Sequence, residues 1–262
     1  LEKSYGIQPL FSGISFHIEQ GDKIGLIAKN GSGKSTLLKI LAGREQADAG
    51  KLWIHKEVTL AYVEQEPQFD DRLSLLDNLF RSGSPVIEAI KTYEDACDRN
   101  DEAAVQASVV RMDELQAWDF DAKVKQILSR LNIHQLHQST ATLSGGQRKR
   151  VALAKILIDI GFDNKQVLLI MDEPTNHLDI PMVEWLENYL DHQNVTLLLV
   201  THDRYFLDSV CSEIWELDHN QLYVYKGDYE NYLDKKSLRI ENEISSIEKA
   251  RNTYRKELEW MR

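Results

Sequence analysis

The sequence predicts an α/β fold with a largely parallel sheet, covering helices and an inserted helical segment. Two short runs rich in Leu and β-branched residues, at 167–171 and 195–200, are typical of strands that are buried on both faces. Each run follows a stretch with helical spacing, and such alternation implies parallel strands with helices packed on them. Between residues 67 and 138, by contrast, the pattern is helical and acidic. The chain therefore combines an α/β body with a helical part.

Composition and charge limit the classes of function. The 262 residues, 42% of them apolar and 28% charged, exclude collagen-like and disordered chains. The net charge of −11 argues against nucleic-acid binding by the whole surface, but it allows a local basic patch or a nucleotide pocket. No apolar run reaches the ~20 residues that a membrane helix needs. Cys97 and Cys211 lack the spacing of a zinc site or a disulfide framework, which predicts a cytoplasmic protein.

The first 60 residues predict short strands joined by turns. Strands are expected at 14–18 and 23–27, on either side of the turn formed by Gln20, Gly21 and Asp22. A glycine-rich loop then precedes a helix at 35–41. Further strands are expected at 52–54 and 59–63.

The helical segment predicts two or three amphipathic helices within residues 87–131, with a turn near Asn100. Ser74 and Asp77 have the spacing of a capping box. From residue 66 to residue 135 there are 14 Asp and Glu against 8 Lys and Arg. This favours a solvated helical subdomain, with a basic partner for the acidic face as the alternative.

The α/β pattern returns after residue 140. Helices are expected at 147–158 and 182–190, before the two buried strands or between them. Residues 235–262 contain no Gly or Pro and many charges, so they predict the start of a long exposed helix.

The glycine-rich loop has the order of a phosphate-binding loop between a strand and a helix. Its residues, here called the phosphate loop, are Ala28, Lys29, Asn30, Gly31, Ser32, Gly33, Lys34, Ser35 and Thr36. Loop and helix N–H groups would surround the phosphates, Lys34 would reach the β- and γ-phosphates, and the Ser35 hydroxyl would coordinate Mg²⁺. Ala28 stands where the motif has Gly. It would cost on the order of 1 kcal/mol at positive φ and nothing at negative φ.

Two further segments complete the predicted chemistry. Asp172 and Glu173 follow a buried strand at the sheet edge where ligands bind; Asp172 would hold Mg²⁺, and Glu173 would orient and partly deprotonate the attacking water. The signature segment, Ser144, Gly145, Gly146 and Gln147, precedes a helix and offers a second anion site. One chain therefore carries two phosphate-binding surfaces.

These motifs resemble those of the ATP-binding cassette (ABC) ATPases, and the resemblance covers residues 1–233. It includes Gln65 at the position of the family's Q-loop, Asp179 at the position of its D-loop, and His202 directly after a buried strand. The resemblance implies a P-loop NTPase of the ABC type, with a mixed sheet, an antiparallel β part and an α-helical subdomain inserted at about 67–158. It also implies that ATP and Mg²⁺ are bound.

The resemblance further implies a composite site, in which ATP lies between the phosphate loop of one cassette and the signature segment of another. Ser144, Gly145 and Gly146 would contact the γ-phosphate in trans, with Gln147 and Asp179 also at the nucleotide. His202 would contact the γ-phosphate and the catalytic water. Gln65 would sense Mg²⁺ and that water, and Tyr5 would stack on adenine.

Residues 172–179 and 201–208 resemble the ABC-F branch most closely, and residues 227–262 are similar to its Uup-type subgroup. ABC-F proteins carry two cassettes in one chain, have no membrane domain and act on ribosomes; the Uup type is also linked to DNA. The resemblance implies an N-terminal cassette and, at 234–262, the start of a charged interdomain linker. The second cassette would be the missing C-terminal half or a second copy arranged head to tail.

Residues 226–262, which include the linker, hold 9 Lys and Arg against 8 Asp and Glu, so this part of the chain is the least acidic. This charge is consistent with a linker that contacts ribosomal RNA or branched DNA, with a solvated helix as the alternative. The isolated chain is expected to be a weak ATPase. The alternative function is the nucleotide-binding subunit of a membrane ABC transporter. A Rad50-type or SMC-type ATPase is excluded because no long coiled coil separates Lys34 from Leu143, and a switch GTPase because the Asn-Lys-x-Asp motif is absent.

Overall fold

The computed structural model describes residues 1–6, 8–64, 67–80, 85–162, 166–193 and 195–260. In this part of the chain, six strands form one sheet in the order β4-β5-β6-β3-β7-β8. Their bounds are β3 Lys23–Ala28, β4 Val58–Val63, β5 Gln166–Asp172, β6 Thr196–Val200, β7 Glu213–Asp218 and β8 Gln221–Lys226. Only β8 runs antiparallel to its neighbour. A separate antiparallel pair is formed by β1 (Lys3–Tyr5) and β2 (Gln8–Phe11). The predicted mixed sheet is confirmed.

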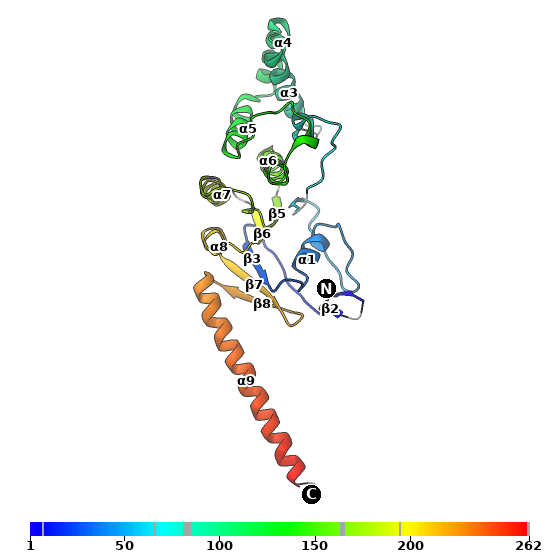
Figure 1. The fold of residues 1–262 in the computed structure, drawn as a ribbon, viewed down its shortest axis with the longest axis vertical. Helices are drawn as coiled ribbons and strands as arrows, with labels where there is room; N and C mark the ends of the chain where they lie inside the picture. The colour runs from blue at the N-terminus through cyan, green and yellow to red at the C-terminus, as the bar shows by residue number, and fades with distance from the viewer. Residues whose placement is uncertain (7, 65–66, 81–84, 163–165, 194, 261–262) are drawn as a thin grey trace.

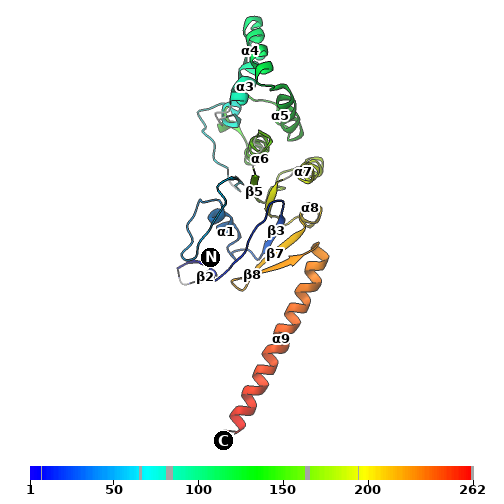
Figure 2. The same ribbon diagram turned by 180° about the vertical axis from the view of Figure 1, so that it is seen from behind.

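The inner strand β5 is buried on both faces, as its apolar run predicts. Leu169 and Met171 pack into one core layer, while Leu168 and Ile170 pack into the other. The helix α1 (Lys34–Leu41) covers the second face, and α6 (Gly145–Phe162), α7 (Ile180–His192) and α8 (Arg204–Val210) cover the first (Figures 1 and 2). Alternate residues of one strand therefore join two hydrophobic layers.

A helical segment lies between β4 and β5 in the chain. It contains α2 (Leu75–Leu79), α3 (Pro85–Asp98), α4 (Glu102–Glu114), α5 (Trp118–Arg130), the short 3₁₀ helix η1 (Thr140–Thr142) and α6. Ser74 caps α2 by accepting a hydrogen bond from the Asp77 N–H at 3.0 Å, which confirms the predicted cap. Asn100 has a φ of 52°, so it forms the predicted turn before α4. Figure 1 shows α3, α4 and α5 at the end of the molecule away from the C-terminus.

Two strand predictions are wrong. Residues 14–18 and 52–54 contain no strand. Ile14 is buried, and Phe16 and Ile18 pack against the core layer under α1. The backbone of Ile14 exchanges two hydrogen bonds with Leu1, one of them from the Ile14 N–H to the Leu1 carbonyl at 3.1 Å, but this pairing does not extend into a strand. Trp53 is 79% exposed, and residues 52–54 join neither of the two sheets formed by the described residues. The helices predicted at 147–158 and 182–190 exist and each extends further at both ends.

The C-terminal helix α9 (Tyr229–Trp260) projects away from the sheet (Figures 1 and 2). Its first turns are fixed to β7 by Glu216, which is 3% exposed. This carboxylate accepts hydrogen bonds from the Tyr232 hydroxyl at 3.0 Å, from Arg239 Nη2 at 3.0 Å and from Lys236 Nζ. Among the described residues, no helix is both long and apolar enough to cross a membrane.

Candidate nucleotide site

The phosphate loop connects the end of β3 directly to the start of α1. Gly31 (φ 80°) and Gly33 (φ 99°) both adopt the left-handed conformation that glycine tolerates. Ala28 is the last residue of β3 and is not among the described residues with positive φ. The alanine that replaces the expected first glycine is therefore unstrained.

A cavity of about 610 Å³ opens at the carboxyl ends of β3, β5 and β6. It brings together most of the residues that the sequence predicts for the nucleotide. Its lining comprises Tyr5, Leu10, Lys29, Asn30, Gly31, Gly33, Lys34, Ser35, Thr36, Asp172, Glu173, Asn176, Val200 and His202. Open α/β sheets bind their ligands at this edge. Leu10, Asn176 and Val200 were not predicted as site residues. Asn176 lies within the segment 172–179, which carried the resemblance to the ABC-F branch, whereas Leu10 belongs to no recognisable motif.

Ser35 and Asp172 meet inside this cavity from different elements. The Ser35 hydroxyl, in the first turn of α1, donates a hydrogen bond to Asp172 Oδ2 at 2.8 Å. Asp172 ends β5 and is 5% exposed. A buried carboxylate beside a hydroxyl is a donor set that suits Mg²⁺, which binds one or two carboxylates together with substrate phosphates. The residues therefore fit the predicted metal.

Lys34 folds back over its own loop. Its Nζ donates to the Ala28 carbonyl at 2.6 Å. Burial lowers the pKa of the Lys34 amine, while Glu173 and Asp172 act in the opposite direction. The nearby Ser32 hydroxyl is buried and has no hydrogen-bond partner among the described residues. The lysine suits a ligand with many acceptor oxygens, such as a polyphosphate, whereas Ser32 does not itself line the cavity.

Glu173 has a left-handed backbone conformation that is uncommon for a glutamate. Its φ is 53°, and its N–H donates to the Val200 carbonyl at 2.8 Å. The carboxylate faces His202, whose N–H donates to Oε2 at 3.3 Å and whose Nε2 lies 3.4 Å from Oε1. Burial raises the pKa of Glu173, against the opposing effect of His202. A strained residue with a raised pKa in a cavity is typical of a general base.

The signature segment lies outside this cavity. The helix α6 begins at Gly145, two residues earlier than predicted. The Ser144 N–H donates to Gln147 Oε1 at 2.9 Å, and the Gln147 N–H donates to Ser144 Oγ at 3.3 Å. These reciprocal bonds form a capping box. The Ser-x-x-Gln spacing at the start of the helix is the signal in the sequence that predicts this cap.

The remaining predicted residues have separate positions. The Tyr5 ring is 57% exposed at the cavity, and its hydroxyl donates to Glu45 Oε1 at 2.6 Å. Asp179 does not line the cavity; it caps α7 by accepting a hydrogen bond from the Met182 N–H at 3.0 Å. Gln65 lies outside the described residues.

Comparison with known proteins gives several matches. The family described as ABC transporter matches residues 11–176, and a second family with the same description matches residues 215–262. An uncharacterized ABC transporter ATP-binding protein of Bacillus subtilis, YfmR, is 40% identical over the whole chain, which covers 42% of that relative. The energy-dependent translational throttle protein EttA is 33% identical in Mycobacterium tuberculosis (100% of this chain, 47% of the relative) and 34% identical in Escherichia coli K12 (97% and 46%).

The chain therefore spans less than half the length of these curated relatives. A solved structure titled as the ATP binding subunit of an ABC transporter has the same fold, with a TM-score of 0.65 at 20% identity over 91% of this chain and 92% of that one. ABC ATPase domains bind ATP with Mg²⁺, in agreement with the composition of the cavity. The family match, which covers more than half of the chain, and the shared fold together show that this protein belongs to the ABC transporter family of ATP-binding domains.

Proposed function

We propose that this chain is one cassette of an ABC-F-type ATPase that hydrolyses ATP with Mg²⁺ at a site shared between two cassettes. One observation carries the proposal. The cavity holds the phosphate loop, Asp172, Glu173 and His202, but none of the signature segment. Each of the two phosphate-binding surfaces is thus half a site, and the other half must come from a second cassette.

In this mechanism the phosphate loop binds the ATP phosphates through its N–H groups and through Lys34. Asp172 and Ser35 would hold Mg²⁺, which when bound neutralises charge on the phosphate oxygens. Glu173 accepts a proton from the attacking water, a task that suits its raised pKa. His202 fixes the direction of the Glu173 carboxylate through the two contacts described above. The partner's signature segment would supply N–H donors for the γ-phosphate.

We further propose that residues 1–233 form the cassette, with the helical insertion at about 67–158, and that 234–262 begin an interdomain linker. The helix α9 already begins at Tyr229 and is bound through Glu216, so this boundary lies within one continuous helix. The linker would contact ribosomal RNA in the cytoplasm. The name of EttA, which refers to translation, supports the ribosome over branched DNA.

The catalytic proposal is tested with Glu173→Gln. This variant should bind ATP as tightly as the parent, hydrolyse it at least ~100-fold more slowly because a general base contributes about 10²–10⁴-fold, and form a stable pair when ATP and Mg²⁺ are present. Hydrolysis by the parent chain should rise more steeply than protein concentration. Phosphate release and light scattering measure the two effects. The exposed Glu184 on α7 provides the matched control, Glu184→Gln. If Glu173→Gln hydrolysed ATP at the parent rate, Glu173 would not be the general base.

The partner is tested with the corresponding full-length protein carrying Glu173→Gln. In the presence of ATP, this protein should co-sediment with ribosomes. Co-sedimentation with branched DNA alone would favour the DNA-linked function, and co-purification with a membrane protein would favour a transporter subunit. Either result would overturn the ribosomal assignment.

A further inference from the structure

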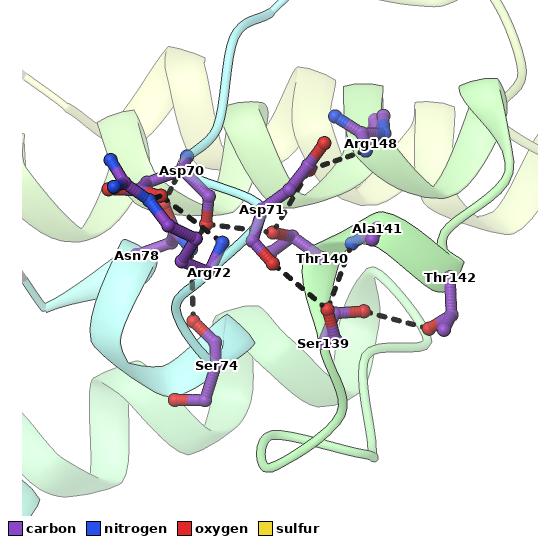
Figure 3. Close-up of polar contacts among 10 residues, drawn as sticks. All are labelled: Asp70, Asp71, Arg72, Ser74, Asn78, Ser139, Thr140, Ala141, Thr142 and Arg148. Atoms are coloured by element: carbon purple, nitrogen blue, oxygen red, sulfur yellow. Dashed lines mark hydrogen bonds and ion pairs between the residues drawn. The ribbon is translucent and has the colours of Figure 1, made fainter.

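The signature segment is held in place by a residue far from it in the sequence. Asp71 lies in the stretch that leads into α2, and Arg148 is the residue directly after the signature segment. Arg148 Nη2 donates to Asp71 Oδ1 at 2.7 Å, across a separation of 77 residues. Figure 3 shows Asp71 between Arg148 on one side and Ser139 and Thr140 on the other.

The same residue also holds the turn that precedes the signature segment. The Ser139 hydroxyl donates to the Asp71 carbonyl at 3.2 Å, and the Thr140 hydroxyl approaches Asp71 Oδ1 at 3.5 Å. Thr140 is fully buried, and its hydroxyl also donates to the Asp70 carbonyl at 3.2 Å. Asp71 therefore contacts the chain on both sides of the signature segment (Figure 3).

These contacts continue into the signature segment itself. The Arg148 N–H donates to the Ser144 carbonyl at 2.9 Å, so the residue bound by Asp71 closes the first turn of α6. On the other side, the Leu143 N–H donates to the Thr140 carbonyl at 3.2 Å, and Leu143 is buried. Gly145 and Gly146, at the start of α6, therefore lie between two flanks that side-chain and backbone contacts hold in place.

We propose that Asp71 is a positioning residue for the composite ATP site. It orients the signature segment toward the partner cassette and makes no contact with the nucleotide in its own cavity. Asp71 also lies six residues after Gln65 in the sequence, so it links the signature segment to the stretch that follows that residue. The inference rests on the composite mechanism proposed above.

The test uses Asp71→Asn in the same chain. The variant should bind ATP as the parent does, because Asp71 does not line the cavity. Its hydrolysis at high protein concentration should fall by about 10-fold or more, because small displacements of groups that contact the transition state are costly. Its melting temperature should stay within about 3 °C of the parent, since the Asp71–Arg148 pair is partly exposed. Asp71→Glu should restore part of the rate, and Asp119→Asn, on α5 in the same helical segment, is the charge-matched control.

Mixing experiments separate a defect in the signature half from a general defect. In a head-to-tail pair of Asp71→Asn with Lys34→Ala, one of the two sites has an intact phosphate loop and an intact signature segment. This mixture should hydrolyse ATP faster than the two variants do separately. A mixture of Asp71→Asn with Ser144→Ala has no intact site and should show no such gain.

Several outcomes would overturn the inference. They are wild-type hydrolysis by Asp71→Asn, loss of its ATP binding, and equal behaviour of the two mixtures. As a second readout, Asp71→Asn in the Glu173→Gln background should need about 10-fold more protein for ATP-dependent pairing, and unchanged pairing would equally overturn it. If the parent chain itself neither hydrolyses ATP nor pairs, the composite mechanism is wrong. That result differs from one in which the parent is active and Asp71→Asn behaves like it, which would contradict only the role of Asp71.

Discussion

The phosphate-loop half and the signature half of this cassette are built by different means. In the first half, the ends of three neighbouring strands deliver the phosphate loop, Asp172 and the segment before His202 to one cavity. In the second, the largely exposed first turn of the otherwise buried helix α6 has its own capping box and is held by one ion pair, Asp71–Arg148. One half is fixed by the sheet and the other by side chains.

Because of this difference, ATP binding by a single cassette and ATP hydrolysis by two paired cassettes depend on different parts of the molecule. Because the sheet edge is buried and rigid, the cavity is already shaped for phosphates in a single cassette. The signature segment is exposed and becomes useful only when a second cassette is present. We therefore expect that the ATP affinity of a single cassette responds to changes in the phosphate loop of the first half, whereas changes in the second half leave this affinity unchanged and alter only pairing and hydrolysis.

The largest expected effect concerns Lys34. Hydrogen bonds to charged groups contribute about 1.5–3 kcal/mol, so Lys34→Ala should weaken ATP binding by roughly 10- to 150-fold. Ser144→Ala should leave the affinity of the separate chain unchanged, although it slows hydrolysis by paired chains. Titration with a fluorescent ATP analogue at low protein concentration measures both affinities. If Lys34→Ala and Ser144→Ala lost ATP affinity to the same extent, both halves of the cassette would contribute to ATP binding by a single chain.

The sequence predicted the sheet-fixed half well. The run before Asp172 has a strand signal that local residues determine, and the phosphate loop has a fixed spacing. The residues that these motifs name meet in one cavity because parallel strands place their carboxyl ends at the same edge. Tyr5 also reaches the cavity, whereas Asp179 caps α7 outside it. Gln65 stays a prediction.

The side-chain-fixed half was predicted less completely. Asp71 and Arg148 are unremarkable charged residues in the sequence, and only the packing of the helical segment brings them together. The strand expected at 14–18 is absent for a related reason: its apolar residues pack under α1, and its backbone pairs with the first residue of the chain only at Ile14. Tertiary contacts of this kind leave no local signal.

The next prediction concerns Glu173 and pH. Burial raises the pKa of its carboxyl above the value in the unfolded chain, so the unfolded state releases its proton first as pH rises. Stability should therefore fall as pH rises from the unfolded pKa to the folded pKa, and then stay constant. Glu173→Gln should remove this decline and melt at a higher temperature than the parent at neutral pH. Thermal unfolding across a pH series measures the effect.

The same shift predicts the pH dependence of catalysis. A base must be ionised, so hydrolysis should be lost as pH falls through the raised pKa of Glu173, above the range of an ordinary glutamate. Ser144→Ala should lower the rate without moving this profile, because the signature half does not touch the carboxylate in a single cassette. A profile that moves with Ser144→Ala would break the separation of the two halves.

The smallest expected effect comes from the capping box. Loss of a helix N-cap interaction costs about 0.5–2 kcal/mol, so Gln147→Ala should lower the melting temperature by a few degrees. Gln147→Glu is the informative partner variant, because glutamate at this position completes a capping box as well as glutamine does. It should therefore melt like the parent, yet hydrolyse ATP more slowly, since a new carboxylate would repel the γ-phosphate of the partner cassette. Calorimetry and phosphate release on the two variants would thus assign the structural role of Gln147 and its contact with nucleotide separately. If Gln147→Glu instead hydrolysed ATP at the parent rate, Gln147 would only cap α6, and the signature half would act through Ser144 and the two glycines.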